Sequence, residues 1–230
     1  MADRYEDLPV RSPELRAILD DLLEHAGSTP EGPPHPAKAE AKPWNYDRSA
    51  YRCRGVPERA ALVLGAGIGD NPARRALREA RAADITFVVL EGDTGVGKTI
   101  AAAEAVMARY PYPAERLRTA PLMVHARDAV RACRESTPLP GHLWDHTRLS
   151  DCDLLALDDL GAEMRDSKRW ASGVLGSLLE SRHDRCLRTI VTTNITREEF
   201  AERYNDRLLA RIQDGGRWVK VEGQDLRRSS

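Results

Sequence analysis

The chain has 230 residues, of which 41% are hydrophobic and 31% are charged, and its formal net charge is -1. This length fits one large domain, or one domain with a small appendage. The near-neutral charge excludes a uniformly basic nucleic-acid-binding protein, so any surface for nucleic acid must be a local patch. No apolar run approaches the roughly 18 residues that a membrane span needs, and the first ten residues lack the pattern of a signal peptide. We therefore expect a cytoplasmic protein without membrane contact.

The N-terminal part of the sequence predicts a short helix on a tether. Residues 12–26 begin with a capping serine, Ser12, continue with a proline at the first helical position, and carry an apolar stripe. Residues 28–43 contain five prolines and almost no apolar side chains, which is typical of a linker. We divide the chain into a helical segment (residues 1–27), a proline-rich linker (28–50) and a main domain (51–230). The apolar stripe either packs on the main domain or docks on another protein.

Residues 62–70, LVLGAGIGD, are rich in glycine and superficially similar to a dinucleotide-binding loop. The spacing does not fit that fingerprint, because Asp70 stands where the third glycine belongs. We interpret the stretch as a glycine-rich loop that leads into a helix over residues 72–83.

From residue 84 onward, stretches typical of strands alternate with stretches typical of helices. The expected strands are continuous apolar runs, as buried parallel strands are, and they cover residues 85–90, 122–125, 153–159, 189–194 and 217–221. Helices are expected over residues 98–109, 126–135 and 167–183, and after a capping box formed by Thr196 and Glu199. The helix over 167–183 should turn Trp170 inward together with its aliphatic side chains. This alternation predicts an α/β fold with a five-stranded, doubly wound parallel sheet.

The stretch EGDTGVGKT, residues 91–99, follows the first of these strands and opens the next helix. Its spacing, Gly92-x-x-x-x-Gly97-Lys98-Thr99, is a complete phosphate-binding loop, or P-loop. Its glycines let backbone N–H groups turn toward phosphate, and the helix N-terminus adds positive charge. Lys98 should reach the β- and γ-phosphates, and Thr99 should offer its hydroxyl to Mg²⁺. The residues expected to bind the nucleotide are Gly92, Asp93, Thr94, Gly95, Val96, Gly97, Lys98, Thr99 and Ile100.

A P-loop needs an acidic partner at the end of a second buried strand, and the stretch LLALDD supplies one. Asp158 should hold Mg²⁺, directly or through water, and Asp159 is the candidate base that positions the attacking water. Asn194 ends the following strand at the same edge of the sheet. Its amide is placed to hydrogen-bond the water or the γ-phosphate.

Arg207 and Arg211, in DRLLARI, are four residues apart and therefore share one face of a helix. They either form an ordinary salt-bridged helix face, or one of them is an arginine finger that adds positive charge to the γ-phosphate of a neighbouring subunit. The residues alone leave both interpretations open.

Taken together, LEGDTGVGKT, LLALDDLGAE, TIVTTNIT and RLLARI resemble, in order and spacing, the DnaC-type helicase loaders. The related transposition helpers of the IstB type share the pattern, and both groups are AAA+ ATPases. The resemblance covers roughly residues 53–227, and DDLGAE is its most specific motif. It implies an AAA+ core with ATP and Mg²⁺ as cofactors, and no C-terminal helical lid.

The resemblance also implies a role for each motif residue. The catalytic residues would be Lys98, Asp159, Asn194 and Arg211, and the metal ligands would be Thr99 and Asp158. In this scheme Arg211 is the arginine finger, Arg207 is an accessory basic residue, and Arg227 matches a C-terminal arginine of the family. Generic AAA+ proteins more often have glutamate where Asp159 stands. Because aspartate is one methylene shorter, we expect slow ATP hydrolysis.

By analogy with the loaders, residues 1–27 would bind a partner protein. The function favoured by the sequence is an ATP-dependent loader that assembles into a homo-oligomer, binds single-stranded DNA and delivers a DnaB-like replicative ring helicase. The alternative is an IstB-like helper that forms ATP-dependent assemblies on double-stranded DNA and stimulates a transposase. A small P-loop kinase is a third possibility, but the sequence shows no lid for a phosphate acceptor.

Overall fold

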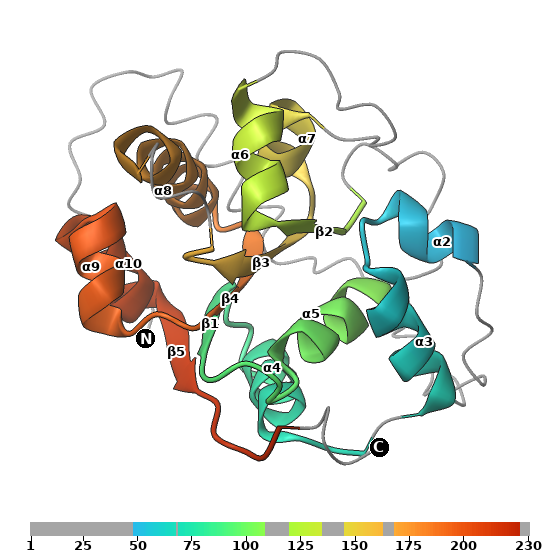
Figure 1. The fold of residues 1–230 in the computed structure, drawn as a ribbon. Helices are drawn as coiled ribbons and strands as arrows, with labels where there is room; N and C mark the ends of the chain where they lie inside the picture. The colour runs from blue at the N-terminus through green and yellow to red at the C-terminus, as the bar shows by residue number, and fades with distance from the viewer. Residues whose placement is uncertain (1–47, 68, 109–119, 135–144, 163–167, 226–230) are drawn as a thin grey trace, which may run out of the picture. The chain divides into compact units, whose positions relative to one another are not determined.

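The computed structural model describes residues 48–67, 69–108, 120–134, 145–162 and 168–225, all of which belong to the unit formed by residues 44–230 (Figure 1). The predicted N-terminal helix over residues 12–26 and the linker up to residue 47 lie outside the described residues. Among the described helices, none has the length and apolar character needed to cross a membrane.

The described strands form one parallel sheet. They are β1 (Phe87–Glu91), β2 (Leu122–His125), β3 (Leu154–Leu160), β4 (Arg188–Thr193) and β5 (Gly216–Lys220). Their order across the sheet is β2-β3-β4-β1-β5, and every neighbouring pair is parallel. The predicted α/β fold with a five-stranded parallel sheet is confirmed. The order also inserts β4 between β1 and β3, so the strands that carry the P-loop and the aspartate pair have β4 as a common neighbour.

The described helices connect and cover these strands. They are α2 (Arg48–Cys53), α3 (Glu58–Ala66), α4 (Pro72–Ala82), α5 (Lys98–Met107), α6 (Ala126–Arg134), α7 (His146–Asp151), α8 (Lys168–Asp184), α9 (Arg197–Tyr204) and α10 (Asp206–Gly215). The start of α9 confirms the predicted capping box, since the Thr196 side chain accepts from the Glu199 amide and the Glu199 side chain accepts from the Thr196 amide. Such a cap satisfies two backbone donors that a helix N-terminus would otherwise leave unpaired.

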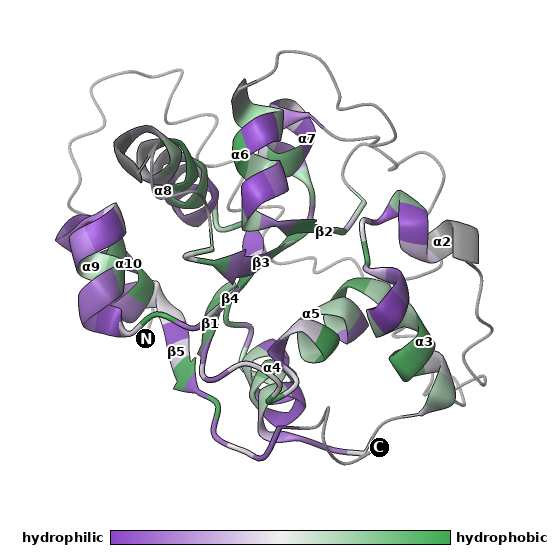
Figure 2. Cartoon of the chain, viewed as in Figure 1, coloured by the Kyte–Doolittle hydropathy of each residue, from purple (hydrophilic) through white to green (hydrophobic). Residues whose placement is uncertain are grey.

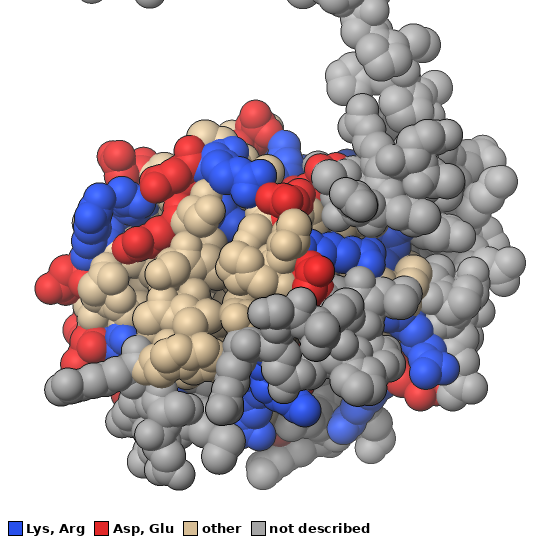
Figure 3. Space-filling view, turned by 90° about the horizontal axis from the view of Figure 1, so that it is seen from above, with Lys and Arg blue, Asp and Glu red and all other residues tan. Residues whose placement is uncertain are grey.

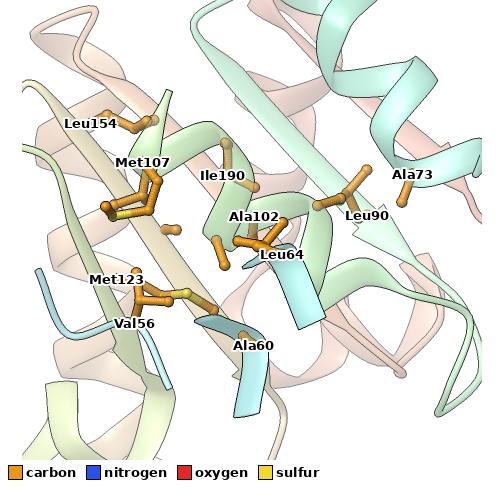
Figure 4. Close-up of a cluster of buried hydrophobic side chains, with 14 of the residues drawn as sticks. Val56, Ala60, Leu64, Ala73, Leu90, Ala102, Met107, Met123, Leu154 and Ile190 are labelled. Carbon is orange, nitrogen blue, oxygen red and sulfur yellow. The ribbon is translucent and has the colours of Figure 1, made fainter. Parts of the chain in front are cut away.

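Two separate hydrophobic layers pack on the two faces of the sheet. Alternate residues of β1 show the division, because Val88 and Leu90 belong to one layer while Phe87 and Val89 belong to the other. Helices α3, α4 and α5 supply the first layer, part of which is drawn in Figure 4, and α6 to α10 supply the second. In Figure 2 the central strands are accordingly green and the helices carry purple outer faces. Burial on both faces explains why the strands read as continuous apolar runs.

One charged side chain lies completely inside the second layer. Arg182, near the end of α8, has no exposed surface. Its guanidinium donates to the main-chain oxygens of Leu149, Ser150, Cys152 and Arg188 at 2.8–3.1 Å. Burial lowers the pKa of this guanidinium, and the carbonyl acceptors compensate for its lost hydration. The contacts tie α8 to the residues around the starts of β3 and β4.

Two local expectations from the sequence are wrong, and one helix was not predicted. Leu62 to Ala66 form the last turn and a half of α3, so the glycine-rich loop is confined to the residues between α3 and α4. Helix α7 was not expected, because its six residues are too few to show helical periodicity; Asp145 caps it by accepting from the Arg148 amide. Trp170 does not turn inward, since 45% of it is exposed.

Candidate functional site

The P-loop connects β1 to α5, as its sequence predicts. Gly95 and Gly97 have φ values of 94° and 90°, in the left-handed region that side chains with a Cβ rarely adopt. Gly97 caps α5, and the helix begins at Lys98. The loop therefore ends on a helix N-terminus, where the first backbone N–H groups have no partner within the helix itself, and this is a favourable place for a phosphate group.

The Lys98 ammonium group folds back over the loop that precedes it. Its Nζ donates to the carbonyl oxygens of Gly92 at 2.7 Å and Asp93 at 2.8 Å. These contacts hold the positive charge at the entrance of the P-loop. A phosphate oxygen can exchange with either carbonyl, because an ammonium group is a compact donor on a flexible stem.

Thr99 and Asp158 meet beside the P-loop, as expected for a magnesium site. Thr99 Oγ1 donates to Asp158 Oδ1 at 3.0 Å, and Thr192 Oγ1, from β4, donates to the same oxygen at 2.6 Å. Asp158 is only 7% exposed, and this burial raises the pKa of its carboxyl, although the two hydroxyl hydrogen bonds act in the opposite direction. One carboxylate and one hydroxyl next to a phosphate-binding loop fit Mg²⁺, which usually takes one or two protein oxygens and completes its shell with phosphate and water.

The Asp159 side chain points toward the surface, away from the contact between Thr99 and Asp158. Its φ is 58°, and the pairing of β3 with β4 is irregular between Leu157 and Leu160. The Asp159 amide donates to Thr192 Oγ1 at 2.9 Å, which fixes the bulge. Its side chain is 51% exposed. A β-bulge turns a side chain out of the alternating pattern of the strand, and here it makes the carboxylate of Asp159 accessible to water.

His125 is a residue of this site that was not predicted. It ends β2, opposite Asp158 of β3, and its Nε2 lies 3.5 Å from Asp159 Oδ2. The Arg127 amide donates to His125 Nδ1 at 3.2 Å, so Nδ1 is the acceptor and the ring proton is on Nε2, facing Asp159. The available signal was a polar residue at the end of an apolar strand, LMVH. Without the strand order, nothing in the sequence places it beside the aspartate pair.

Asn194 lies where the sequence predicts, directly after β4. It is exposed, and a Cβ added to Gly161, just after β3, would lie 3.7 Å from Asn194 Oδ1. Thr193 Oγ1 donates to the Leu160 carbonyl at 2.7 Å and holds these two strand ends together. The P-loop, the aspartate pair and Asn194 therefore share the carboxyl edge of the sheet.

Arg211 is not brought to this edge within one chain. Its guanidinium donates to Asp184 Oδ1 at 2.7 Å, and Asp184 is the last residue of α8, just before β4 begins. The pair therefore lies near the amino ends of the strands, opposite the P-loop. Arg207 is exposed and has no hydrogen bond or ion pair within the described part of the chain. Arg227 lies outside the described residues.

A small, partly open cavity of about 70 Å³ lies at the same amino edge of the sheet. Side chains of α4 and α5 and the first residues of β1, β3 and β4 line it, among them Leu77, Ile85 and Arg188. It carries none of the predicted site residues and lies away from the P-loop.

A local basic patch for nucleic acid is not evident on the face drawn in Figure 3. Among the described residues of that face, Lys and Arg side chains alternate with Asp and Glu around an uncharged area. Alternating signs produce a weak net field, in contrast to the single-sign surface that steers nucleic acid. The figure therefore identifies no DNA-contacting residues.

Solved structures of other proteins share the α/β fold of this chain. The DnaC helicase loader is 20% identical, with a TM-score of 0.54 over 72% of this chain and 100% of that chain. DnaI is 21% identical, with a TM-score of 0.53 over 72% of this chain and 94% of that chain. The replication initiator DnaA bound to AMPPCP and single-stranded DNA is 16% identical, with a TM-score of 0.51 over 74% of this chain and about half (51%) of that chain. No protein-family model matches the sequence, and no curated protein matches it. The resemblance to DnaC-type loaders is confirmed at the level of the fold.

Proposed function

We propose that the protein is an ATP-dependent loader of a replicative ring helicase. The observation that carries the proposal is the contact of Thr99 with Asp158 beside a complete P-loop, in a sheet of the order β2-β3-β4-β1-β5. This contact unites the two halves of an ATP site, and the DnaC helicase loader has a similar fold over its whole length. Fold alone does not fix function, so the proposal rests on the site and the motif order together.

In this proposal the carboxyl edge of the sheet binds ATP. The P-loop amides and Lys98 hold the phosphates, and Thr99 and Asp158 would hold Mg²⁺, which neutralises phosphate charge when bound. Asp159 accepts a proton from the attacking water, because its carboxylate is exposed at the bulge. Asn194 orients that water or the γ-phosphate.

His125 acts through Asp159 in this proposal, as a positioning residue. Its Nε2–H faces Asp159 Oδ2, and its ring is fixed from the other side by the Arg127 amide. A fixed donor restricts the rotation of an exposed carboxylate and holds it at one angle to the γ-phosphate. Replacement of His125 by alanine should therefore reduce turnover more than it reduces ATP affinity.

The proposal makes Arg211 an arginine finger that acts on a neighbouring subunit. Its ion pair with Asp184 places it near the amino edge of the sheet, so it cannot reach the P-loop of its own chain. A site that needs a residue from the next subunit is complete only in an assembly. ATP hydrolysis then depends on whether neighbours are present, and it releases the partner.

Single-stranded DNA and a DnaB-like ring helicase are the partners we propose, and residues 1–27 are the segment that binds the helicase. The assignment is tested by co-purification with the ring helicase encoded by the same genome, in the presence of a slowly hydrolysed ATP analogue. We expect capture by the full chain, loss after deletion of residues 1–43, and loss in Lys98→Ala. Unchanged capture after the deletion would contradict helicase binding through this segment. Capture of a transposase in place of the helicase, with assembly on double-stranded DNA, would support the IstB-like alternative.

A further inference from the structure

The segment that follows β5 runs along the P-loop. The Val221 amide donates to the Glu91 carbonyl at 2.6 Å, directly before the P-loop begins, and the Trp218 Nε1–H donates to the Glu91 carboxylate at 2.6 Å. Figure 1 shows the segment leaving the sheet at β5, the edge strand beside β1. These bonds fix the direction in which residues 221–225, here called the tail, leave the sheet.

Two P-loop glycines are in direct contact with this tail. A Cβ built on Gly92 would lie 2.3 Å from the Val221 carbonyl oxygen. A Cβ built on Gly95 would lie 2.0 Å from Asp225 Oδ1 and 3.1 Å from Oδ2. Neither position has room for a side chain, so the carboxylate of Asp225 rests against the Cα of Gly95, in the middle of the loop.

A carboxylate at this position is unfavourable for the ligand that the loop is built to hold. The P-loop provides backbone N–H groups and one ammonium group for a triphosphate of high negative charge. A negative charge in contact with the loop repels that ligand, and the repulsion grows with the number of phosphate charges.

We propose that Asp225 is an affinity-setting residue of the phosphate site: it weakens the binding of ATP while the tail is docked on Gly95, and ATP binding displaces the tail. The inference rests on the proposed ATP site, and adds that the tail after β5 reports whether the loop is filled. Because ATP carries one more negative charge than ADP, Asp225 disfavours ATP more strongly than ADP.

The test is nucleotide affinity in Asp225→Asn, measured by calorimetry with ATP and with ADP on the full chain. Glu222→Gln is the matched control, since Glu222 is an exposed carboxylate on the same tail whose Oε1 pairs with Lys220 Nζ at 3.2 Å. We expect Asp225→Asn to tighten ATP binding by about three- to tenfold and ADP binding by less, as one neighbouring surface charge can produce. Glu222→Gln should change either affinity by less than about twofold. The gain should shrink when salt is raised to 0.5 M, because added ions screen the charge.

Displacement of the tail is measured separately, by hydrogen exchange of the Val221 amide with and without ATP. Faster exchange on ATP binding is expected, since the hydrogen bond of the Val221 amide to Glu91 would open more often.

Equal ATP affinities in Asp225→Asn and wild type, or weaker binding by the variant, would overturn the proposal. Asp225→Ser serves as the test variant if the asparagine variant does not fold. If the protein captures the helicase but Asp225→Asn does not change ATP affinity, the loader function stands and the proposed role of Asp225 fails. If Asp225→Asn tightens ATP binding but the protein does not capture the helicase, the role of Asp225 stands and the loader function fails.

Discussion

Thr99 Oγ1 donates to Asp158 Oδ1 at 3.0 Å across 59 residues of sequence. The contact brings the first residues of α5 to the end of β3, with Thr192 of β4 as a second donor to the same oxygen. Because β4 lies between β1 and β3, its hydroxyl can reach an aspartate that the P-loop also contacts. A single buried carboxylate oxygen therefore links three elements of the site.

The buried carboxylate of Asp158 should make the nucleotide-free protein less stable than Asp158→Asn at neutral pH. Burial raises the pKa of Asp158 above its ordinary value of 3.8, so ionisation costs stability in the folded state. The cost is present above the raised pKa and disappears as pH falls through it. At pH 7 we expect Asp158→Asn to raise Tm by about 2–4 °C, the shift that roughly 1 kcal/mol produces in a domain of this size.

Thermal unfolding of both proteins between pH 4 and pH 8, without Mg²⁺ and nucleotide, measures this difference. The two Tm values should converge toward the acid end. A gap that widens as pH falls would show that the ionised carboxylate stabilises the fold. The same variant should lose the stabilisation that Mg²⁺-ATP gives to the wild type.

Lys98→Ala should weaken ATP binding by about a hundredfold or more, because the ammonium group is the positive side chain at the entrance of the loop. Lys220→Ala removes an equal charge from a residue whose ammonium group pairs with the surface carboxylate of Glu222, and should leave affinity almost unchanged. Fluorescence titration with a labelled nucleotide measures both. Retained affinity in Lys98→Ala would contradict the assignment of the P-loop.

Asp159→Glu should speed ATP hydrolysis by several-fold, since the longer side chain brings the carboxylate closer to the γ-phosphate. Asp159→Asn should nearly abolish it, because an amide cannot accept the proton. Both variants should bind ATP as the wild type does, since Asp159 lies on an exposed bulge beyond the buried pair. Steady-state phosphate release provides the measurement. Undiminished release by the asparagine variant would exclude Asp159 as the base.

Much of this site could be predicted from sequence because its parts are local. The P-loop is contiguous in the sequence. The strands β3 and β4 are recognisable as apolar runs that are followed by polar residues, among them Asp158 and Asn194. Parallel strands end at a common edge, so the predicted strands already placed these residues together. The capping box at Thr196 was equally readable, because its partners are three residues apart.

The remaining features depend on strand order and on long-range packing. His125 meets Asp159 only because β2 is the neighbour of β3. Trp170 follows the helical period of α8, yet the period does not reveal that the helix start is left exposed. The contact of Asp225 with Gly95 joins residues that are far apart in the sequence and has no sequence signal.

Arg211→Ala should bind ATP within about twofold of wild type and lose at least tenfold in turnover, because an arginine finger contributes at the transition state. Arg207→Ala is the matched control on the same helix. Because the Arg207 side chain is exposed, its removal should reduce turnover less than the removal of Arg211 does. Mixing Arg211→Ala with Lys98→Ala should restore part of the turnover, since each variant supplies the half-site that the other lacks. Absence of rescue at every ratio would mean that Arg211 does not act between subunits.

The central claim is that the protein uses ATP to place a ring helicase on DNA. The most direct measurement is unwinding by the ring helicase of a duplex annealed to circular single-stranded DNA, which offers the ring no end to thread. We predict that the protein with ATP stimulates unwinding strongly, and that Lys98→Ala and Arg211→Ala do not. Equal unwinding with and without the protein, in the presence of ATP, would contradict the loader function.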